Sequence, residues 1–304
     1  MHHSFDFTST TEKIVTDWSE RAEINLYVKH DDLVHPTIIG NKWRKLKYNL
    51  QEARRLSRKT LLTFGGAFSN HIHATAAAAK EYGFESIGII RGEELGHDSN
   101  PTLRFAHAHG MDLRFISRAN FRLFKDNPKL MEMDLSSVYL LPEGGTNDLA
   151  IKGCAEIPSE IQVAFDYLIT SIGTGGTMAG LIEGAKGKGE IIGVSALKGN
   201  FIQKDLEILL SENNIQKTNY RVLTSYHFGG YGRVNSELIQ FINETKNLEG
   251  LKLDPIYTGK TYFAVRDMAR KNYFTRGSNV VFLHTGGLQG VDGFNQKHDN
   301  KIEF

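Results

Sequence analysis

Short apolar runs alternate with helix-like stretches through the first half of the chain. Three runs have the length and composition of buried strands: Thr60–Phe64, Glu85–Arg91 and Met111–Ser117. Between them, the alanine-rich segment Ser69–Lys80 predicts a helix capped by Ser69 or Asn70, and Pro101–His109 predicts a helix with proline at an early position. This alternation is typical of an α/β protein with a mostly parallel sheet and helices on its faces.

The same alternation returns in the second half of the chain. Strands are predicted at Phe165–Ile172, Glu190–Leu197 and Val280–Leu283, and a helix at Met178–Lys186. Between the halves, Pro142–Asp148 is dense in turn-forming residues, and we take it as a crossing between two lobes. We expect a smaller α/β lobe at residues 48–145 and a larger, cofactor-binding lobe at residues 1–47 plus 146–304. A chain of 304 residues is long enough for both.

Charge and cysteine content narrow the class of protein. Lys and Arg number 36 and Asp and Glu 35, which argues against a nucleic-acid or anionic-membrane binder. The chain contains no run of about eighteen apolar residues, so no membrane helix is predicted. Met1–Phe7 lacks the pattern of a signal peptide. The single cysteine, Cys154, can form neither an internal disulfide nor a cysteine-based zinc site. We expect a cytoplasmic protein.

A glycine-rich loop between a predicted strand and a predicted helix is the sharpest local signal. It consists of Gly173, Thr174, Gly175, Gly176 and Thr177. Glycines let successive N–H groups point at one anion, and the following helix adds the positive end of its dipole. The loop is neither a Walker A nor a dinucleotide fingerprint. It predicts a phosphate site, and the alternative is an ordinary tight strand–helix turn.

Two further segments carry candidate chemistry. Lys42 lies close in sequence to Arg44 and Lys45, and nearby cations favour the neutral amine that attacks a carbonyl. The plain alternative is a solvated basic helix face. After Gly65-Gly66, the sequence Ser69-Asn70-His71 opens a predicted helix, where amide and hydroxyl donors suit a carboxylate. The alternative there is a simple N-terminal cap.

Taken together, these segments resemble the family of 1-aminocyclopropane-1-carboxylate (ACC) deaminase and D-cysteine desulfhydrase. The resemblance runs from about Gly40 to Gly287, in kind, order and spacing. It rests on the lysine segment Gly40–Tyr48, on Gly65–Asn70, on Pro142–Gly145, on the loop Gly173–Thr177, on Tyr231, on Tyr257–Lys260 and on His284–Gly287. The family belongs to the tryptophan-synthase-β-like, fold type II enzymes. The resemblance implies a two-lobed, three-layer α/β/α fold, a homodimer and pyridoxal 5'-phosphate as cofactor.

The resemblance also implies roles for individual residues. Lys42 would hold the cofactor as a Schiff base. The other cofactor contacts would be Lys45, Asn70, the loop from Gly173 to Thr177, and Thr285 at the pyridine nitrogen. Catalysis would involve Lys42, Tyr257, Tyr231 and Ser69. The substrate contacts would be Ser69, Asn70, His71 and Thr258.

Two threonines separate the branches of the family. ACC deaminases have glutamate and leucine where this chain has Thr258 and Thr285. A glutamate would keep the pyridine nitrogen protonated, which makes the ring a strong electron sink. A hydroxyl leaves a milder sink, which suffices when a thiolate departs. One departure from the family is Phe68, where relatives often have a polar residue before Ser69.

We therefore expect a deaminating lyase that acts on small amino acids, with D-cysteine giving pyruvate, sulfide and ammonia. The first alternative is ACC deamination to 2-oxobutanoate and ammonia. A second is another reaction on the same scaffold, such as racemisation, dehydration or β-synthesis. The third is a non-catalytic amino-acid-binding protein.

Overall fold

The larger of two sheets has six strands in the order β1-β2-β10-β7-β8-β9. The computed structural model describes residues 5, 7–217, 219–299 and 301–304, so most of the segment Met1–Phe7 lies outside the described residues. The strands are β1 (Thr11–Ile14), β2 (Asn25–Lys29), β7 (Tyr167–Ile172), β8 (Glu190–Ser195), β9 (Tyr220–Leu223) and β10 (Asn279–Leu283). All pairs are parallel except β1 with β2.

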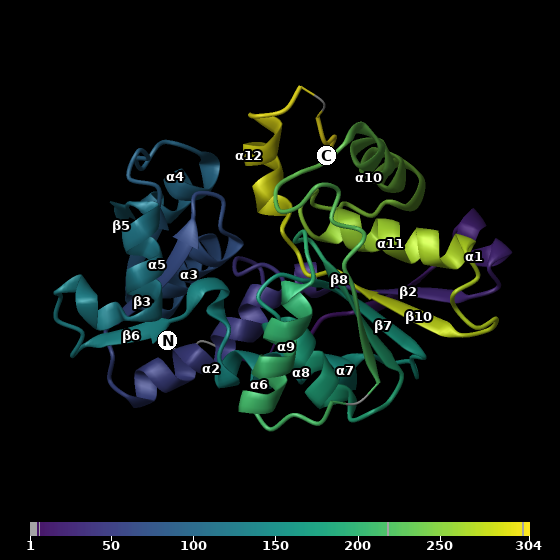
Figure 1. The fold of residues 1–304 in the computed structure, drawn as a ribbon, viewed down its shortest axis with the longest axis horizontal. Coiled ribbons are helices and arrows are strands. Elements are labelled where there is room, and N and C mark those ends of the chain that lie inside the picture. The colour runs from purple at the N-terminus through teal and green to yellow at the C-terminus, as the bar shows by residue number, and fades with distance from the viewer. Residues whose placement is uncertain (1–4, 6, 218, 300) are drawn as a thin grey trace.

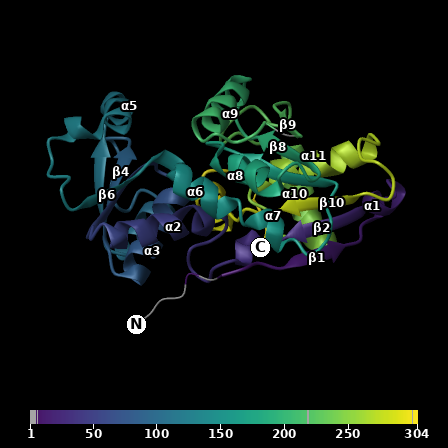
Figure 2. The ribbon, with the colours of Figure 1, turned by 90° about the horizontal axis from the view of Figure 1, so that it is seen from below.

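The smaller sheet is parallel throughout and has the order β5-β4-β3-β6. Its strands are β3 (Thr60–Gly66), β4 (Glu85–Arg91), β5 (Met111–Ile116) and β6 (Val138–Leu141). The two sheets lie side by side, and α2 (Asn41–Arg55) and α6 (Asp148–Cys154) lie between them (Figures 1 and 2). The predicted α/β class with mostly parallel sheets is confirmed. The lobe boundaries at residues 48 and 145 stay a prediction.

Helices cover both faces of the larger sheet because its strands alternate their apolar side chains. Val280 and Phe282 pack with α1 (Asp17–Arg21), α10 (Ser236–Glu249) and α11 (Thr258–Arg270). Val281 and Leu283 point to the opposite face. That face is covered by α6, α7 (Ile157–Glu160), α8 (Gly176–Ala185) and α9 (Phe201–Glu212). A strand that is buried on both faces has a continuous run of apolar residues, as β10 has from Val280 to Leu283.

The smaller sheet is covered in the same way. Residues of α2, α3 (Asn70–Tyr82) and α4 (Pro101–Ala108) pack on one face, and α5 (Arg118–Asp126) packs on the other through Phe121. The remaining helix is α12 (Val291–Asn295), and single-turn helices lie at Asp31–Leu33, Pro128–Met131, Glu143–Gly145 and Leu288–Gly290. No helix of the described part of the chain is both long and apolar enough to cross a membrane.

Most predicted elements are present within a few residues of their expected ends. Ser69 caps α3 by accepting the N–H of Ile72 at 3.3 Å, as the sequence indicates. The helix after the glycine loop begins at Gly176 instead of Met178, because the last loop glycine already adopts helical geometry. The predicted crossing Pro142–Asp148 connects β6 to α6.

Candidate active site

The first turn of α2 is fastened to the loop that follows β10. Gly40 has a φ of +71°, and a Cβ at this position would lie 2.0 Å from the carbonyl oxygen of Thr285. Only glycine allows this approach. The N–H of Asn41 then donates to the same oxygen at 3.2 Å. Lys42 and Thr285 are therefore brought together, although they are far apart in the sequence.

The Lys42 amine lies in a cavity at the start of α2. Its Nζ donates to Oδ1 of Asn41 at 3.1 Å. Burial, and after it the charge of Lys45, lowers the pKa of Lys42 to about 7. A substantial fraction of the amine is therefore neutral near neutral pH, which is the form that attacks a carbonyl carbon.

Arg44 does not belong to this cavity, although it is close to Lys42 in sequence. Its guanidinium is buried on the other side of α2, where it donates to Asp31 at 3.0 and 3.1 Å and to Glu160 at 2.7 Å. Lys29 donates to the same carboxylate of Glu160 at 3.0 Å. This ion-pair network orients α2, so the cation that lowers the pKa of Lys42 is Lys45.

Lys45 is buried without a carboxylate partner among the described residues. Its Nζ donates to the carbonyl oxygen of Gly144 at 3.0 Å, to Oγ1 of Thr146 at 3.0 Å and to Oγ1 of Thr174 at 3.2 Å. Burial lowers the pKa of Lys45 to about 8. A cation surrounded by neutral oxygens retains its capacity to bind an anion.

The glycine loop supplies the other half of an anion site. Helix α8 has ten residues, and no side chain caps its start at Gly175, so its first N–H groups have no intrahelical acceptor. A Cβ on Gly176 would lie 2.8 Å from Oγ1 of Thr146 and 3.3 Å from Nζ of Lys45. A side chain there would fill the space in front of the lysine. The loop and Lys45 together fit a phosphate group.

His71 also lines the cavity and is almost completely buried. Neither ring nitrogen has a hydrogen-bond partner in the described structure. Burial, followed by the charges of Lys42 and Lys45, keeps its pKa well below the usual range, so the imidazole is neutral. Buried polar groups in folded proteins usually have a hydrogen-bond partner. The orientation of His71 toward the cavity fits a polar ligand.

Two tyrosines close the cavity on the side of the larger sheet. The rings of Tyr231 and Tyr257 pack against each other, with their centres 6.0 Å apart and an angle of 63° between their planes. Burial, and after it Tyr231, raises the pKa of Tyr257 well above its usual value. Tyr257 therefore stays protonated. A Cβ on Gly173 would lie 3.4 Å from Cε1 of Tyr257, so this ring adjoins the phosphate loop.

The structure places nearly all the predicted site residues around one cavity. The predicted residues that line it are Lys42, Lys45, Ser69, Asn70, His71, Gly173, Thr174, Gly175, Thr177, Tyr231, Tyr257 and Thr285. Gly176 follows in the same loop, at the start of α8.

Thr258 is the exception, because it does not line the cavity. It is fully buried, and its hydroxyl and N–H donate to Oδ2 of Asp254 at 2.6 and 2.8 Å. Asp254 also accepts the N–H groups of Ile256 and Tyr257 at 2.8 Å and so organises the start of α11. The hydroxyl of Thr258 is therefore engaged at the start of the helix and does not face the substrate site.

Several lining residues were missed by the sequence reasoning. They are Asn41, Gly144, Ser171, Met178 and Gly286. Asn41 is the most informative of these, because its Nδ2 donates to Oγ1 of Thr177 at 2.8 Å and so ties the lysine segment to the phosphate loop. Its place directly before the lysine was the available signal. Asp254, which organises the start of α11, was also missed, because no helix was predicted to begin there.

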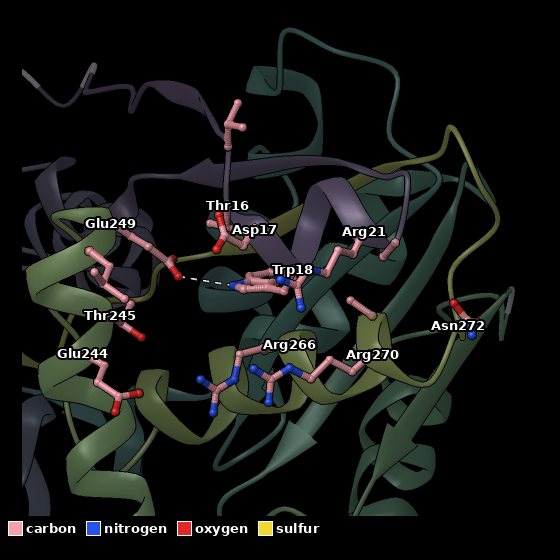
Figure 3. Close-up of a pocket in the computed structure, with 14 residues that line it drawn as sticks. Thr16, Asp17, Trp18, Arg21, Glu244, Thr245, Glu249, Arg266, Arg270 and Asn272 are labelled. Atoms are coloured by element: carbon pink, nitrogen blue, oxygen red, sulfur yellow. Dashed lines mark hydrogen bonds between the residues drawn. The ribbon is translucent and has the colours of Figure 1, made fainter.

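A larger cavity, of about 540 Å³, lies elsewhere, between α1, α10 and α11. Figure 3 shows Trp18 donating to Glu249, with Arg266 and Arg270 extending from α11. We call it the arginine cleft, since Arg21 lines it as well. It has no lysine and no glycine loop among its lining residues, so it lacks the chemistry of the Lys42 cavity.

Comparison with known proteins agrees with this geometry. A family model described as "Pyridoxal-phosphate dependent enzyme" matches residues 15–286. The chain belongs to this family. The protein is thus a pyridoxal-phosphate (PLP) enzyme and not a non-catalytic binding protein, and the predicted cofactor and fold type are confirmed.

Individual relatives carry both of the names that the predicted family joins, ACC deaminase and D-cysteine desulfhydrase. A "Putative 1-aminocyclopropane-1-carboxylate deaminase" of Thermotoga maritima is 32% identical over 90% of this chain and 92% of its own length. A "D-cysteine desulfhydrase" of Yersinia pestis is 29% identical over 88% and 87%. A crystal structure of an "ACC deaminase homologue" superposes with a TM-score of 0.82 at 26% identity, covering 97% of this chain and 94% of the other.

Proposed function

We propose that this PLP enzyme is a deaminating lyase that acts on D-cysteine and releases pyruvate, sulfide and ammonia. One observation carries the choice of reaction: among the described residues that line the Lys42 cavity there is no aspartate or glutamate, while Thr285 is present. A site without a carboxylate leaves the cofactor a moderate electron acceptor. This favours loss of a thiolate over the more demanding opening of the ACC ring.

The residues fit the cofactor at two ends of the cavity. Lys45 and the loop Gly173–Thr177 would hold the phosphate, and Lys42 would provide the covalent attachment. Asn70 and Thr285 line the cavity between them. The cofactor, when bound, withdraws electrons from the α-carbon of the amino acid. The protein's part is then to orient that amino acid and to move protons.

Proton transfer follows from the pKa values of the side chains. Lys42, with a pKa of about 7, would remove the α-proton. Tyr257 is a poor base because its pKa is raised well above its usual value, but it remains a hydrogen-bond donor. We assign it to protonation of the departing sulfur, with the ring of Tyr231 packed against the ring of Tyr257.

The substrate carboxylate would bind at the start of α3. Ser69 and Asn70 lie at the N-terminal end of this helix, where N–H groups and the helix dipole favour an anion. His71 adds a neutral ring whose nitrogens have no other partner in the described structure. A base at Lys42, a carboxylate anchor at α3 and the bound cofactor would together contact the substrate at three points. This arrangement would select one enantiomer.

ACC deamination is the second candidate, because relatives carry that name. The distinction between the branches now rests on Thr285 alone, since Thr258 is engaged with Asp254. We further propose that the protein is a homodimer and that it lies in the cytoplasm. The family resemblance supports the dimer, and the single buried cysteine, Cys154, is compatible with a reducing compartment.

The test is to offer D-cysteine, L-cysteine and ACC in parallel to purified protein saturated with PLP. We expect sulfide and pyruvate in equal amounts from D-cysteine, and no product from L-cysteine or ACC. Release of 2-oxobutanoate from ACC at a comparable rate would show that Thr285 does not separate the branches. A Thr285→Leu variant sharpens the test, because it should lower D-cysteine turnover more than cofactor binding.

A further inference from the structure

A second cavity, of about 210 Å³, opens directly beside the Lys42 cavity. The two share Asn70, Tyr231 and Tyr257 as a common wall. We call the second cavity the annex. Its surface is largely apolar, with Phe68, Pro255, Ile256 and Phe294 among the lining residues, and Asp254, Lys297 and His298 also line it.

The ring of Phe68 is held firmly in the wall of the annex. A Cβ on Gly293 would lie 2.8 Å from Cε1 of Phe68, so a larger residue there would displace the ring. On the other side, Nζ of Lys297 lies 4.2 Å from the centre of the Phe68 ring. The rings of Phe294 and His298 stack at 4.1 Å. These contacts favour the position in which Phe68 and Phe294 face the annex, so little ordering is needed when a ligand binds.

The annex lies on the side of the cavity away from the phosphate site. Neither Lys42, Lys45 nor any residue of the loop Gly173–Thr177 lines it. The three shared residues, Asn70, Tyr231 and Tyr257, border both the proposed substrate site and the annex. A substrate side chain that extends past these residues reaches the annex.

We propose that the preferred substrate carries an apolar group on its β-sulfur, as in an S-alkyl or S-aryl D-cysteine. This inference rests on the proposed function and narrows its substrate class. D-cysteine itself ends at the thiol and would leave the apolar wall of the annex in contact with water. A longer side chain removes that surface from water, which favours binding by about fourfold for each methylene group buried.

The reaction keeps the balance of the proposed lyase. The α-proton is removed, the bond between the β-carbon and sulfur breaks, and the electron pair leaves with the sulfur as a thiolate that takes up a proton. The remaining three-carbon fragment adds one water and gives pyruvate and ammonium. One S-substituted cysteine and one water thus yield one thiol, one pyruvate and one ammonium, with no external oxidant or reductant.

The experiment compares D-cysteine with its S-methyl and S-propyl derivatives on the PLP-bound enzyme, with pyruvate as the common readout. We expect kcat/KM to rise by about fifteenfold from S-methyl to S-propyl, through the two added methylene groups. Equal or falling values along the series would overturn the inference. If D-cysteine is turned over but the longer substrates are not, only the inference fails. If none of the three yields pyruvate, the proposed function fails.

Binding gives an independent readout that does not need turnover. D-alanine and D-norleucine lack a leaving group, and D-norleucine is longer by three methylene groups. We expect D-norleucine to bind about sixtyfold more tightly in calorimetric titrations of the PLP-bound protein. In Phe68→Gln this preference should fall at least fivefold. A preference unchanged by that substitution would show that the annex does not receive the side chain.

Phe84→Gln is the matched control for Phe68→Gln. Phe84 is also partly buried but lies beyond the other end of α3, about 20 Å away by the helical rise. It should keep the full preference for D-norleucine. An equal loss in both variants would mark a general effect on the fold and would overturn the assignment to Phe68.

Discussion

The Lys42 cavity and the arginine cleft both contain cations without carboxylate partners, but they hold them differently. In the Lys42 cavity, Lys45 is buried and donates to three neutral oxygens at 3.0 to 3.2 Å. In the arginine cleft, Arg266 lies over the ring of Phe241 at 4.0 Å, and neither it nor Arg270 forms an ion pair with a described residue. Arg270 is exposed to solvent.

This difference supports the proposal that the smaller cavity, around Lys42, is the active site. Water screens the exposed charges of the cleft, and long side chains keep their freedom there. In the Lys42 cavity, burial lowers the pKa values of Lys42 and Lys45 to about 7 and 8. Groups with such values exchange protons and bind anions near neutral pH. The surroundings of the cations, and not the volume of the cavity, distinguish the two regions.

The largest effect is expected for Lys42→Ala. Loss of the amine removes both the covalent attachment and the proposed base, so pyruvate release should fall by about a thousandfold or more. Mass spectrometry after borohydride reduction should no longer find the cofactor on the peptide that contains residue 42. The control is Lys47→Ala on the same helix, where the lysine pairs with Glu156 at 2.7 Å. A Lys42→Ala protein that kept both the adduct and its turnover would refute the assignment.

A smaller effect is expected for Lys45→Gln. This change removes a charged donor from the phosphate site, and such hydrogen bonds contribute about 1.5–3 kcal/mol. The dissociation constant for PLP should rise by about 10- to 100-fold in absorbance titrations. Arg270→Gln, which removes a cation from the cleft, should leave that constant unchanged. Equal effects of the two substitutions would remove the distinction between the cavities.

Much of this site follows from sequence, because its segments are local. The loop Gly173–Thr177 and the helix start at Ser69 depend on residues close together in the chain, and short-range patterns identify them. Lys42 and Thr285 were placed in one site only through the family resemblance. Their contact depends on Gly40 against the carbonyl of Thr285, which no local pattern shows.

The errors of the sequence reasoning have the same origin. Arg44 was expected to act on Lys42, but the carboxylates of Asp31 and Glu160, distant in sequence, draw it to the other side of α2. Thr258 was expected at the substrate, but Asp254 engages its hydroxyl. In each case a buried partner elsewhere in the chain decides the direction of the side chain. The annex likewise joins Phe68 to Gly293 and Phe294, which follow more than 200 residues later.

The smallest effect is expected in the cleft itself, for Arg270→Gln. Arg266 and Arg270 lie four residues apart on α11, and the charge of Arg270 contributes, after burial, to the lowered pKa of Arg266. Like charges at this spacing destabilise a helix by about 0.2–0.5 kcal/mol. Removing one should raise the free energy of unfolding by that amount at low salt, measured by urea denaturation, and the gain should fade in 1 M salt.

Arg276→Gln is the matched control for this last prediction. The Arg276 guanidinium is exposed and pairs with Glu23 at 3.0 Å, so its loss should not raise stability. If Arg270→Gln instead lowered the free energy of unfolding, the arginines of the cleft would have to be held by a favourable interaction. Their cations would then resemble Lys45 more than solvated surface charges, and the contrast between the two cavities would no longer hold.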